Sequence, residues 1–209
     1  MKPFAILSVV SLAVACDAAP PAETAARMSL QGEEKTRDDF EKENPKWRFA
    51  EGQWERRAGV LAQTRETEPW AVAVLEDKKF AGIDVSVRVK PLSGKEDQTG
   101  GIIFRARDAK NYYLVRSNGL EANYRLYTMT EGVRKQIAST KVTPPKIGEW
   151  HTLRVVAEGA KIQAYVNDQL LIDHQDGTFA EGYVGLWTKA DSVTELDDLE
   201  AVGTPAKAP

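Results

Sequence analysis

The sequence predicts an all-β domain of antiparallel strands, arranged as a sandwich or a barrel. Apolar and polar residues alternate with a period of two in short runs, as in Ile83–Lys90 and Asn123–Thr128. Such alternation buries one face of a sheet and leaves the other in water. Residues that tolerate positive φ separate the runs, as in Asn118-Gly119 and Glu131-Gly132. No long amphipathic helix lies between the runs, which argues against an α/β fold.

The expected strands follow one another closely along the chain. The first two flank the turn pair Ala58-Gly59, and Pro144-Pro145 interrupts the chain shortly before the strand that opens at Trp150. In chain order they are Trp54–Arg57, Val60–Thr64, Ala71–Leu75, Ile83–Lys90, Gly101–Ala106, Tyr112–Ser117, Asn123–Thr128, Arg134–Thr140, Trp150–Ala157, Lys161–Val166, Leu170–Asp173, Tyr183–Trp187 and Thr194–Val202.

Composition excludes several classes of protein. The 209 residues are 42% hydrophobic and 28% charged, an ordinary globular balance. A formal net charge of −3 offers no basic surface for nucleic acid. A single cysteine excludes an intramolecular disulfide, and one Cys with two His argues against a zinc site. We therefore expect no nucleic-acid partner and, apart from a possible calcium ion considered below, no cofactor.

Residues 1–15 have the features of a secretory signal peptide. Lys2 precedes the apolar run Phe4–Val14, which is too short to span a bilayer. Ala13-Val14-Ala15 is a small-residue cleavage site directly before Cys16. This arrangement resembles the lipobox of bacterial lipoproteins, although Ala13 stands where that motif usually has Leu. The resemblance implies a lipid anchor at Cys16, and ordinary cleavage after Ala15 is the alternative.

These features divide the chain into four parts. Residues 1–15 are the expected signal peptide, 16–37 a flexible tether rich in Ala, Pro and Glu, 38–202 the β domain, and 203–209 a loose tail. A chain of this kind is expected in the periplasm or at the cell surface, held at the membrane through Cys16.

Two stretches, Gly100–Arg134 and Gly148–Val202, resemble the concanavalin A-like lectin/glucanase superfamily. The run W-H-x-L-R-V…Y-V-N…G-x-V-G-L-W-T carries this likeness, which is closer to laminin-G-like modules and to the 3-keto-disaccharide hydrolase domain. The resemblance implies a two-sheet antiparallel jelly-roll sandwich. This fold hosts lectins, hydrolases and interaction modules, so it does not by itself define an activity.

Glu195, Asp197 and Glu200 have an E-x-D-x-x-E spacing that resembles the catalytic signature of laminarinase-type glycoside hydrolases. The resemblance implies that these residues supply a nucleophile and an acid/base. A regular strand would put Glu200 on the face opposite the other two, and those enzymes bring it round with a bulge. The alternative is a final strand with Leu196 buried and its carboxylates in water.

Gly101–Arg105 resembles the glycine–apolar–Phe–Arg strand of the 3-keto-disaccharide hydrolase domain. The Asn-Ser that usually precedes that glycine is replaced by Gln98-Thr99-Gly100, and the acidic stretch that usually follows is replaced by Tyr113–Arg116. These departures indicate a binding-type relative rather than an active hydrolase.

A polar and aromatic set on three consecutive strands is the predicted sugar-binding face. Side chains on one face of neighbouring strands stand about 5 Å apart. Aromatic rings stack on pyranose faces, while Arg and Asn donate to hydroxyls or to uronate carboxylates. Arg105 and Arg125 are the best pair, and an ordinary solvated sheet face is the alternative. The set is Arg105, Arg107, Asn111, Tyr112, Arg116, Asn123, Arg125 and Tyr127.

Two acidic pairs suggest a structural calcium site. Asp38-Asp39 near the first strand and Asp197-Asp198 in the last resemble the paired acidic ends of β-sandwich carbohydrate modules. Carboxylate oxygens suit Ca²⁺, which takes 6–8 oxygen ligands. Separate surface carboxylates are the alternative.

The leading functional interpretation is non-catalytic recognition of a carbohydrate by an exported, membrane-tethered domain. A glycoside hydrolase of the 3-keto-disaccharide hydrolase or laminarinase type is the second interpretation, and an envelope protein-interaction module is the third. A hydrolase requires two converging carboxyl groups, at least one with a raised pKa. A lectin would show a groove of aromatic and Arg side chains without that pair, and an interaction module would show a large exposed apolar patch.

Overall fold

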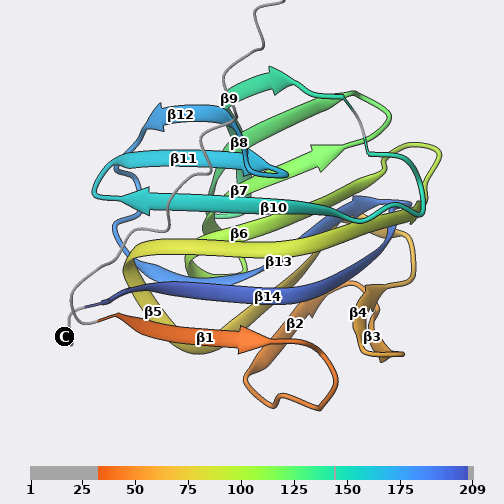
Figure 1. Ribbon diagram of the computed structural model, residues 1–209, viewed down its shortest axis with the longest axis horizontal. Coiled ribbons are helices and arrows are strands. Elements are labelled where there is room, and N and C mark those ends of the chain that lie inside the picture. The colour runs from red at the N-terminus through yellow and green to blue at the C-terminus, as the bar shows by residue number, and fades with distance from the viewer. Residues whose placement is uncertain (1–32, 144, 207–209) are drawn as a thin grey trace, which may run out of the picture.

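The computed structural model describes residues 33–143 and 145–206, which form β-strands joined by loops (Figure 1). This part of the chain contains fourteen strands and no helix. It accordingly holds no helical segment with the length and apolarity needed to cross a bilayer. The expected signal peptide, Cys16 and most of the expected tether lie outside the described residues.

One long strand, β5 (Thr67–Ser93), runs through both layers of the fold. Its first half pairs with β2 (Trp47–Glu51) and β13 (Gly182–Ala190). Its second half pairs with β10 (His151–Glu158) and β14 (Val193–Pro205). The sequence predicts two strands here because the alternation lapses in the middle of β5, yet backbone pairing continues through that stretch.

The first of the two layers is called the β7 layer. It places β2, the first half of β5 and β13 beside four consecutive hairpin-linked strands. These four are β6 (Thr99–Asp108), β7 (Asn111–Asn118), β8 (Asn123–Thr130) and β9 (Val133–Lys141).

The second layer is called the β10 layer. It consists of β1 (Glu34–Asp38), β14, the second half of β5, β10, β11 (Lys161–Val166) and β12 (Gln169–Gln175), in that order. A short hairpin of β3 (Trp54–Arg57) and β4 (Val60–Gln63) pairs with the start of β14.

The main core lies between the two layers. Val85 and Leu153 from the β10 layer belong to the same buried cluster as Phe104 and Leu186 from the β7 layer. Burying one such side chain fully contributes about 1.5–3 kcal/mol. All strand pairs with an assigned register are antiparallel, so the predicted two-sheet antiparallel sandwich is confirmed.

The strands extend beyond both ends of the predicted domain, 38–202. β1 begins at Glu34, and β14 continues to Pro205, so that Glu34 lies opposite Gly203. Only Thr36 and Asp38 of β1 are buried. Backbone pairing with β14, not an apolar face, therefore holds β1 in place, and its polar sequence carries no alternating signal. β2 is also absent from the predicted set, because Trp47 is its one buried residue.

Arg105 and Asp198 have a left-handed backbone conformation within their strands. Arg105 in β6 has φ 49°, and Asp198 in β14 also has φ 49°. The β6–β7 register shifts after Phe104, and the β14–β5 register shifts after Asp197. Each shift is a β-bulge, which re-aims the side chains that follow it.

Candidate functional site

The outer face of the β7 layer, which faces away from the main core, carries a second apolar cluster. Adjacent residues alternate between the two sides, so Tyr112 lies on the outer face while Tyr113 points into the main core. Solvated sheet faces are normally polar, so this composition sets the face apart. The buried members are Val72, Val74, Ile103, Ala106, Tyr112, Leu114, Tyr127, Met129 and Trp187.

Three aromatic rings on this face form what we call the aromatic floor: Trp70, Tyr127 and Trp187. The centroids of the two indole rings are 6.3 Å apart and their planes are tilted by 31°. The guanidinium of Arg134, on β9, lies 5.4 Å from the Trp70 centroid, 4.9 Å from that of Tyr127 and 5.8 Å from that of Trp187. Arg134 thus lies against all three rings through cation–π contacts.

A polar group that we call the Glu121 cluster adjoins the floor. Arg116 Nη2 donates to Glu121 Oε2 at 2.7 Å and to the Tyr127 hydroxyl at 3.2 Å. Arg116 Nη1 donates to Asn123 Oδ1 at 3.1 Å. Arg125 Nη1 lies 3.3 Å from Glu121 Oε2 and 3.4 Å from the Tyr127 hydroxyl. The shared carboxylate fixes both arginines beside the aromatic ring.

Glu121 is firmly ionised in this cluster. Burial disfavours its charged form, but hydrogen bonds from Arg116 and Asn123 outweigh that effect and lower its pKa to about 2. A carboxyl group with such a pKa holds no proton near neutral pH and cannot act there as a general acid.

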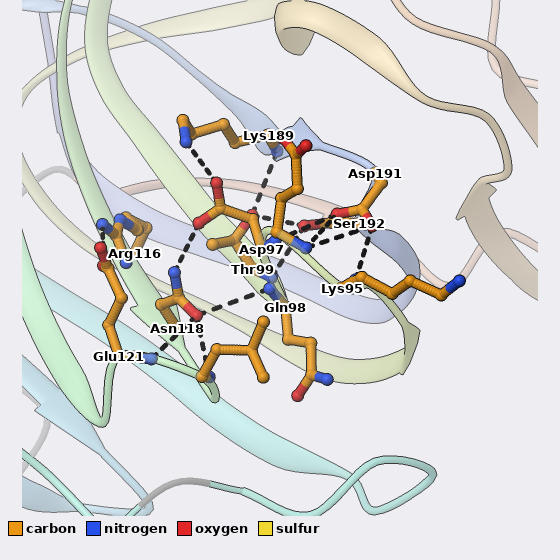
Figure 2. Close-up of polar contacts among 12 residues, drawn as sticks. Lys95, Asp97, Gln98, Thr99, Arg116, Asn118, Glu121, Lys189, Asp191 and Ser192 are labelled. Carbon is orange, nitrogen blue, oxygen red and sulfur yellow. Dashed lines mark hydrogen bonds and ion pairs between the residues drawn. The ribbon is translucent and has the colours of Figure 1, made fainter.

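The other carboxylate near this face, Asp97, is buried and also paired. Figure 2 shows it between Lys189 and Asn118. The Asn118 side-chain amide donates to it at 2.5 Å. Lys189 lies on β13, two residues beyond Trp187, and its ammonium forms an ion pair with Asp97. Asp97 therefore links the loop between β5 and β6 to the strands that carry the aromatic floor.

The loop that carries Asp97 is held by a second aspartate. Asp191 accepts backbone N–H groups from Lys95, Glu96 and Asp97 at 2.5–3.2 Å (Figure 2). Behind it, the Ser192 hydroxyl accepts from the backbone N–H of Thr99 at 3.1 Å. Three hydrogen bonds to one carboxylate make this end of the outer face rigid.

Several buried polar atoms on this face have no hydrogen-bond partner among the described residues. Five such atoms belong to residues already placed there, and all of them can donate. The Tyr112 hydroxyl and the Trp187 indole are close enough to influence each other, but neither supplies an acceptor for the hydroxyl proton. Native structures contain few buried polar groups of this kind, and each needs an explanation. Oxygen atoms of a ligand are the natural acceptors for them. The atoms are the Tyr112 hydroxyl, Arg116 Nε, Arg125 Nε, Arg134 Nη1 and Trp187 Nε1.

Most of the predicted sugar-binding residues do meet on this face. β7 supplies Tyr112 and Arg116, and β8 supplies Asn123, Arg125 and Tyr127. Asn111 instead braces a hairpin end, since its amide contacts Asp108 at 3.0 Å and its carbonyl oxygen accepts the Glu131 N–H.

The placement of Arg105 on a solvated face is wrong. Arg105 is fully buried and donates to the backbone carbonyls of Ala81, Gly159 and Phe179 at 2.8–3.1 Å. The bulge at its own position turns the side chain towards the side of the sheet where Phe179 packs in the main core. Its neighbour Arg107 is exposed, with its guanidinium 5.3 Å from the Phe179 ring.

Three further residues of the face are missing from the predicted set: Trp70, Arg134 and Trp187. Trp187 and Lys189 lie two residues apart on β13, and Arg134 lies opposite Met129 across the β8–β9 ladder. Period-two spacing could have linked them to the face, but only the pairing of strands distant in sequence places β13 between β5 and β6.

The E-x-D-x-x-E residues lie elsewhere, on the β10 layer. The bulge at Asp198 does bring Glu195, Asp197 and Glu200 to one side of β14, since Leu196 and Leu199 between them are buried in the main core. Each acid faces a cation. Glu195 pairs with Lys90 at 2.5 Å, Asp197 with Arg88 at 3.5 Å, and Glu200 with Lys35 at 2.6 Å.

Asp197, the middle acid of this motif, has a raised pKa. Burial raises its pKa, and Asp198 and Asp39 add to the effect, while the Asp198 backbone N–H and Arg88 oppose it. The bulge that the resemblance to laminarinase-type hydrolases requires is therefore present in β14. The three acids lie on the outer face of the β10 layer, on the other side of the sandwich from the aromatic floor.

The four residues of the expected calcium site are engaged differently. Asp38 accepts hydrogen bonds from the Phe40 N–H at 2.8 Å, Asn44 at 2.9 Å and the Trp47 indole at 2.7 Å. These N–H donors occupy its oxygens and hold its pKa low against the opposing effect of burial. Asp197 and Asp198 both contact Arg88, and Asp39 accepts a weak hydrogen bond from the Glu41 N–H at 3.4 Å. No group of three or more potential metal ligands occurs within the described segments.

Comparison with known proteins gives the family. The family described as 3-keto-alpha-glucoside-1,2-lyase-like domain matches residues 33–197. This chain belongs to that family. The match includes the aromatic floor, the Glu121 cluster and β14 as far as Asp197.

Individual relatives of this 3-keto-alpha-glucoside-1,2-lyase-like domain connect it with carbohydrate-active proteins. It is 34% identical over 88 residues to a levanase of Bacillus subtilis, a match that covers 42% of this chain and 13% of the levanase. The chain thus spans a small part of that relative's length.

Solved structures confirm the concanavalin A-like jelly-roll fold. The carbohydrate binding module CBM66 from Bacillus subtilis superposes with a TM-score of 0.68 at 22% identity, covering 74% of this chain and 94% of the module. A beta-glucanase of Bacillus licheniformis gives a TM-score of 0.60 at 12% identity, covering 81% of this chain and 98% of the enzyme. At these identities the likeness defines the fold alone.

Proposed function

We propose that this chain is an exported, membrane-tethered domain that binds a carbohydrate on the outer face of the β7 layer without cleaving it. The observation that carries the proposal is a set of buried donors beside the aromatic floor, those of three arginines above all, that have no acceptor among the described residues. Sugars offer many hydroxyl and ring oxygens, and their apolar C–H faces pack against aromatic rings. The names of the relatives, a carbohydrate binding module and a levanase, support the same ligand class.

The proposal of binding without cleavage rests on the two carboxylates of this face. Glycoside hydrolysis requires a carboxyl group that delivers a proton. Glu121 has a pKa of about 2 and Asp97 forms an ion pair with Lys189. Neither is arranged as a proton donor.

Calorimetric titration with a panel of soluble oligosaccharides tests the proposal. Trp70 is half-buried and Arg125 is partly exposed, so Trp70→Ala and Arg125→Ala are expected to fold. Each should weaken binding by about tenfold or more, which equals about 1.4 kcal/mol. Trp150→Ala is the matched control, because Trp150 lies against Arg88 and Lys90 on the other layer. Absence of binding to the whole panel, or an equal loss in the control, would contradict the proposal.

The membrane-tethering part has its own test. Detergent phase partition of the full chain, produced in a bacterium that processes lipoproteins, should place it in the detergent phase. The variant Cys16→Ala should move to the aqueous phase, because one or more acyl chains supply the membrane affinity. Equal partition of both proteins would argue against lipidation at Cys16.

Cleavage of a glycoside is the second candidate, and two observations favour it. The chain belongs to a family whose description is a lyase-like activity, and the bulge in β14 aligns Glu195, Asp197 and Glu200 on one side. Incubating the panel, together with 3-keto-glucosides, and measuring released sugars tests it. Release that disappears in Glu195→Gln or Glu200→Gln would establish catalysis and overturn the non-catalytic proposal.

A further inference from the structure

Positive charge predominates on the outer face of the β7 layer. Around the aromatic floor, four cationic side chains, Arg116, Arg125, Arg134 and Lys189, stand against two carboxylates, Asp97 and Glu121. Arg48 and Glu76, at the β2 edge of the same face, form an ion pair with each other. The whole chain has a net charge of −3, so this excess of cations is local. Since positive charge placed beside low-dielectric walls attracts anions, the face favours a ligand that carries negative charge.

Each of the two carboxylates forms ion pairs with particular cationic side chains. Glu121 is shared by Arg116 and Arg125, and Asp97 pairs with Lys189. Arg134 differs from these three, because no carboxylate among the side chains that the structure describes pairs with it. Its contacts are the three rings of the aromatic floor.

The unpartnered donors on these arginines narrow the ligand chemistry further. Arg134 Nη1, Arg125 Nε and Arg116 Nε are all buried N–H groups of charged side chains. Leaving such groups without an acceptor is costly. A carboxylate provides two charged acceptor oxygens in one plane, the geometry that a guanidinium matches best, and such bonds are about twice as strong as bonds to a neutral hydroxyl.

From this arrangement we infer that the ligand of the outer face is an acidic saccharide, whose uronate carboxylate is bound by Arg134. The inference rests on the proposed function and adds the class of sugar. Arg134 is the specificity-determining residue, because it contacts every ring of the floor and forms no ion pair with a described carboxylate. Arg116 and Arg125, already neutralised by Glu121, donate to oxygens of the same sugar.

The test compares acidic oligosaccharides with their own neutral forms. Oligogalacturonides and glucuronate-containing oligosaccharides are titrated beside the same preparations after chemical reduction of the carboxyl groups. The wild-type protein should bind the acidic forms about tenfold tighter or more. High salt should reduce this preference, since screening weakens charge pairing at a partly open surface.

Variants then assign the preference to one residue. Arg134→Met keeps an apolar stem against the rings and should remove the preference, while Arg134→Lys should retain part of it. Arg88→Met is the matched control, because the Arg88 guanidinium likewise lies over an indole ring, 4.5 Å from the Trp150 centroid. The control should keep the full preference.

The outcomes separate the two proposals. Equal affinity for acidic and reduced sugars would overturn the acidic-ligand inference and leave carbohydrate binding intact. A preference that survives Arg134→Met would overturn the role of Arg134. Absence of binding to both forms would reject the proposed function itself. If Arg134→Met fails to fold, the comparison of acidic with reduced sugars on the wild-type protein still decides the ligand class.

Discussion

The guanidinium groups of Arg105 and Arg125 lie on opposite sides of the same β layer. Arg105 is buried against three backbone carbonyls, beside Phe179 of the main core. Arg125 contacts the hydroxyl of Tyr127 on the outer face. Both residues sit in strands with alternating sequence, and the bulge at Arg105 is what separates them. Their substitutions should therefore have different effects.

Arg105→Ala should lower the free energy of unfolding by about 3 kcal/mol. The substitution leaves the carbonyls of Ala81, Gly159 and Phe179 without their donor, and each buried unpaired group costs about 1–3 kcal/mol. Urea denaturation measures the change. Arg107→Ala, two residues along and exposed, is the control and should cost well under 1 kcal/mol by the usual value for exposed cation–π contacts. Unchanged stability of Arg105→Ala would show that Arg105 does not hold the fold.

Tyr112→Phe should keep or raise stability while weakening ligand binding. The Tyr112 hydroxyl is buried beside the Trp187 indole, and its proton has no acceptor among the described residues, so its removal relieves a cost of up to about 1 kcal/mol. The loss of a donor on the outer face reduces affinity, a trade-off typical of binding sites.

Tyr124→Phe is the matched comparison for this prediction. Tyr124 is equally buried, but its hydroxyl donates to the Tyr165 carbonyl at 3.3 Å. Its removal should cost about 1 kcal/mol, the usual net value of a hydrogen bond. Thermal denaturation of both variants gives the difference directly. Loss of stability in Tyr112→Phe as large as in Tyr124→Phe would mean that the Tyr112 hydroxyl is bonded in the folded protein.

The sequence predicts the sandwich well because period-two alternation is a local signal. Ile83–Lys90 shows it plainly, and its Val side chains do enter the main core. β1 carries no such signal, since its position depends on β14, which lies far along the chain. The residues of β7 and β8 on the outer face follow from alternation, whereas Trp70 and Trp187 join them only through strand order.

Two β-bulges explain why the sequence misplaces residues of the predicted sites. One extra residue reverses the alternation, so Arg105 moves inward and Glu200 moves to the same side as Glu195. Nothing local distinguishes Arg105 or Asp198 from a regular strand residue, because both owe their left-handed φ to the tertiary pairing around them.

Asp38 should act as a hydrogen-bond centre and not as a calcium ligand. Its oxygens accept hydrogen bonds from the N–H groups of Phe40, Asn44 and Trp47. These oxygens therefore face hydrogen-bond donors and not a cation. Asp38→Asn should therefore destabilise the protein by about 2 kcal/mol, because an amide N–H₂ then faces another donor. Asp39→Asn is the control and should be neutral. A melting temperature that rises on addition of calcium and falls with a chelator would contradict this interpretation.

His151 should make stability depend on pH between about 6.5 and 4. Burial lowers its pKa from 6.5 to about 4, although a hydrogen bond to the Glu149 backbone opposes the shift. The unfolded chain therefore binds a proton that the folded protein excludes, and stability is complete above the unfolded pKa and declines as pH falls towards 4. A shift of this size corresponds to about 3 kcal/mol.

The comparison of wild type with His151→Gln isolates this effect, because Gln can still meet the Ser117 hydroxyl that lies 3.0 Å from His151 Nε2. Urea denaturation at several pH values should show a decline in the wild type between pH 6.5 and 4 that the variant lacks. Carboxylates such as Glu121, whose pKa is lowered from 4.5 to about 2, lose their stabilising effect as pH falls from about 4.5 to 2, where both proteins should weaken together. Parallel curves above pH 4.5 would show that His151 is protonated in the folded state.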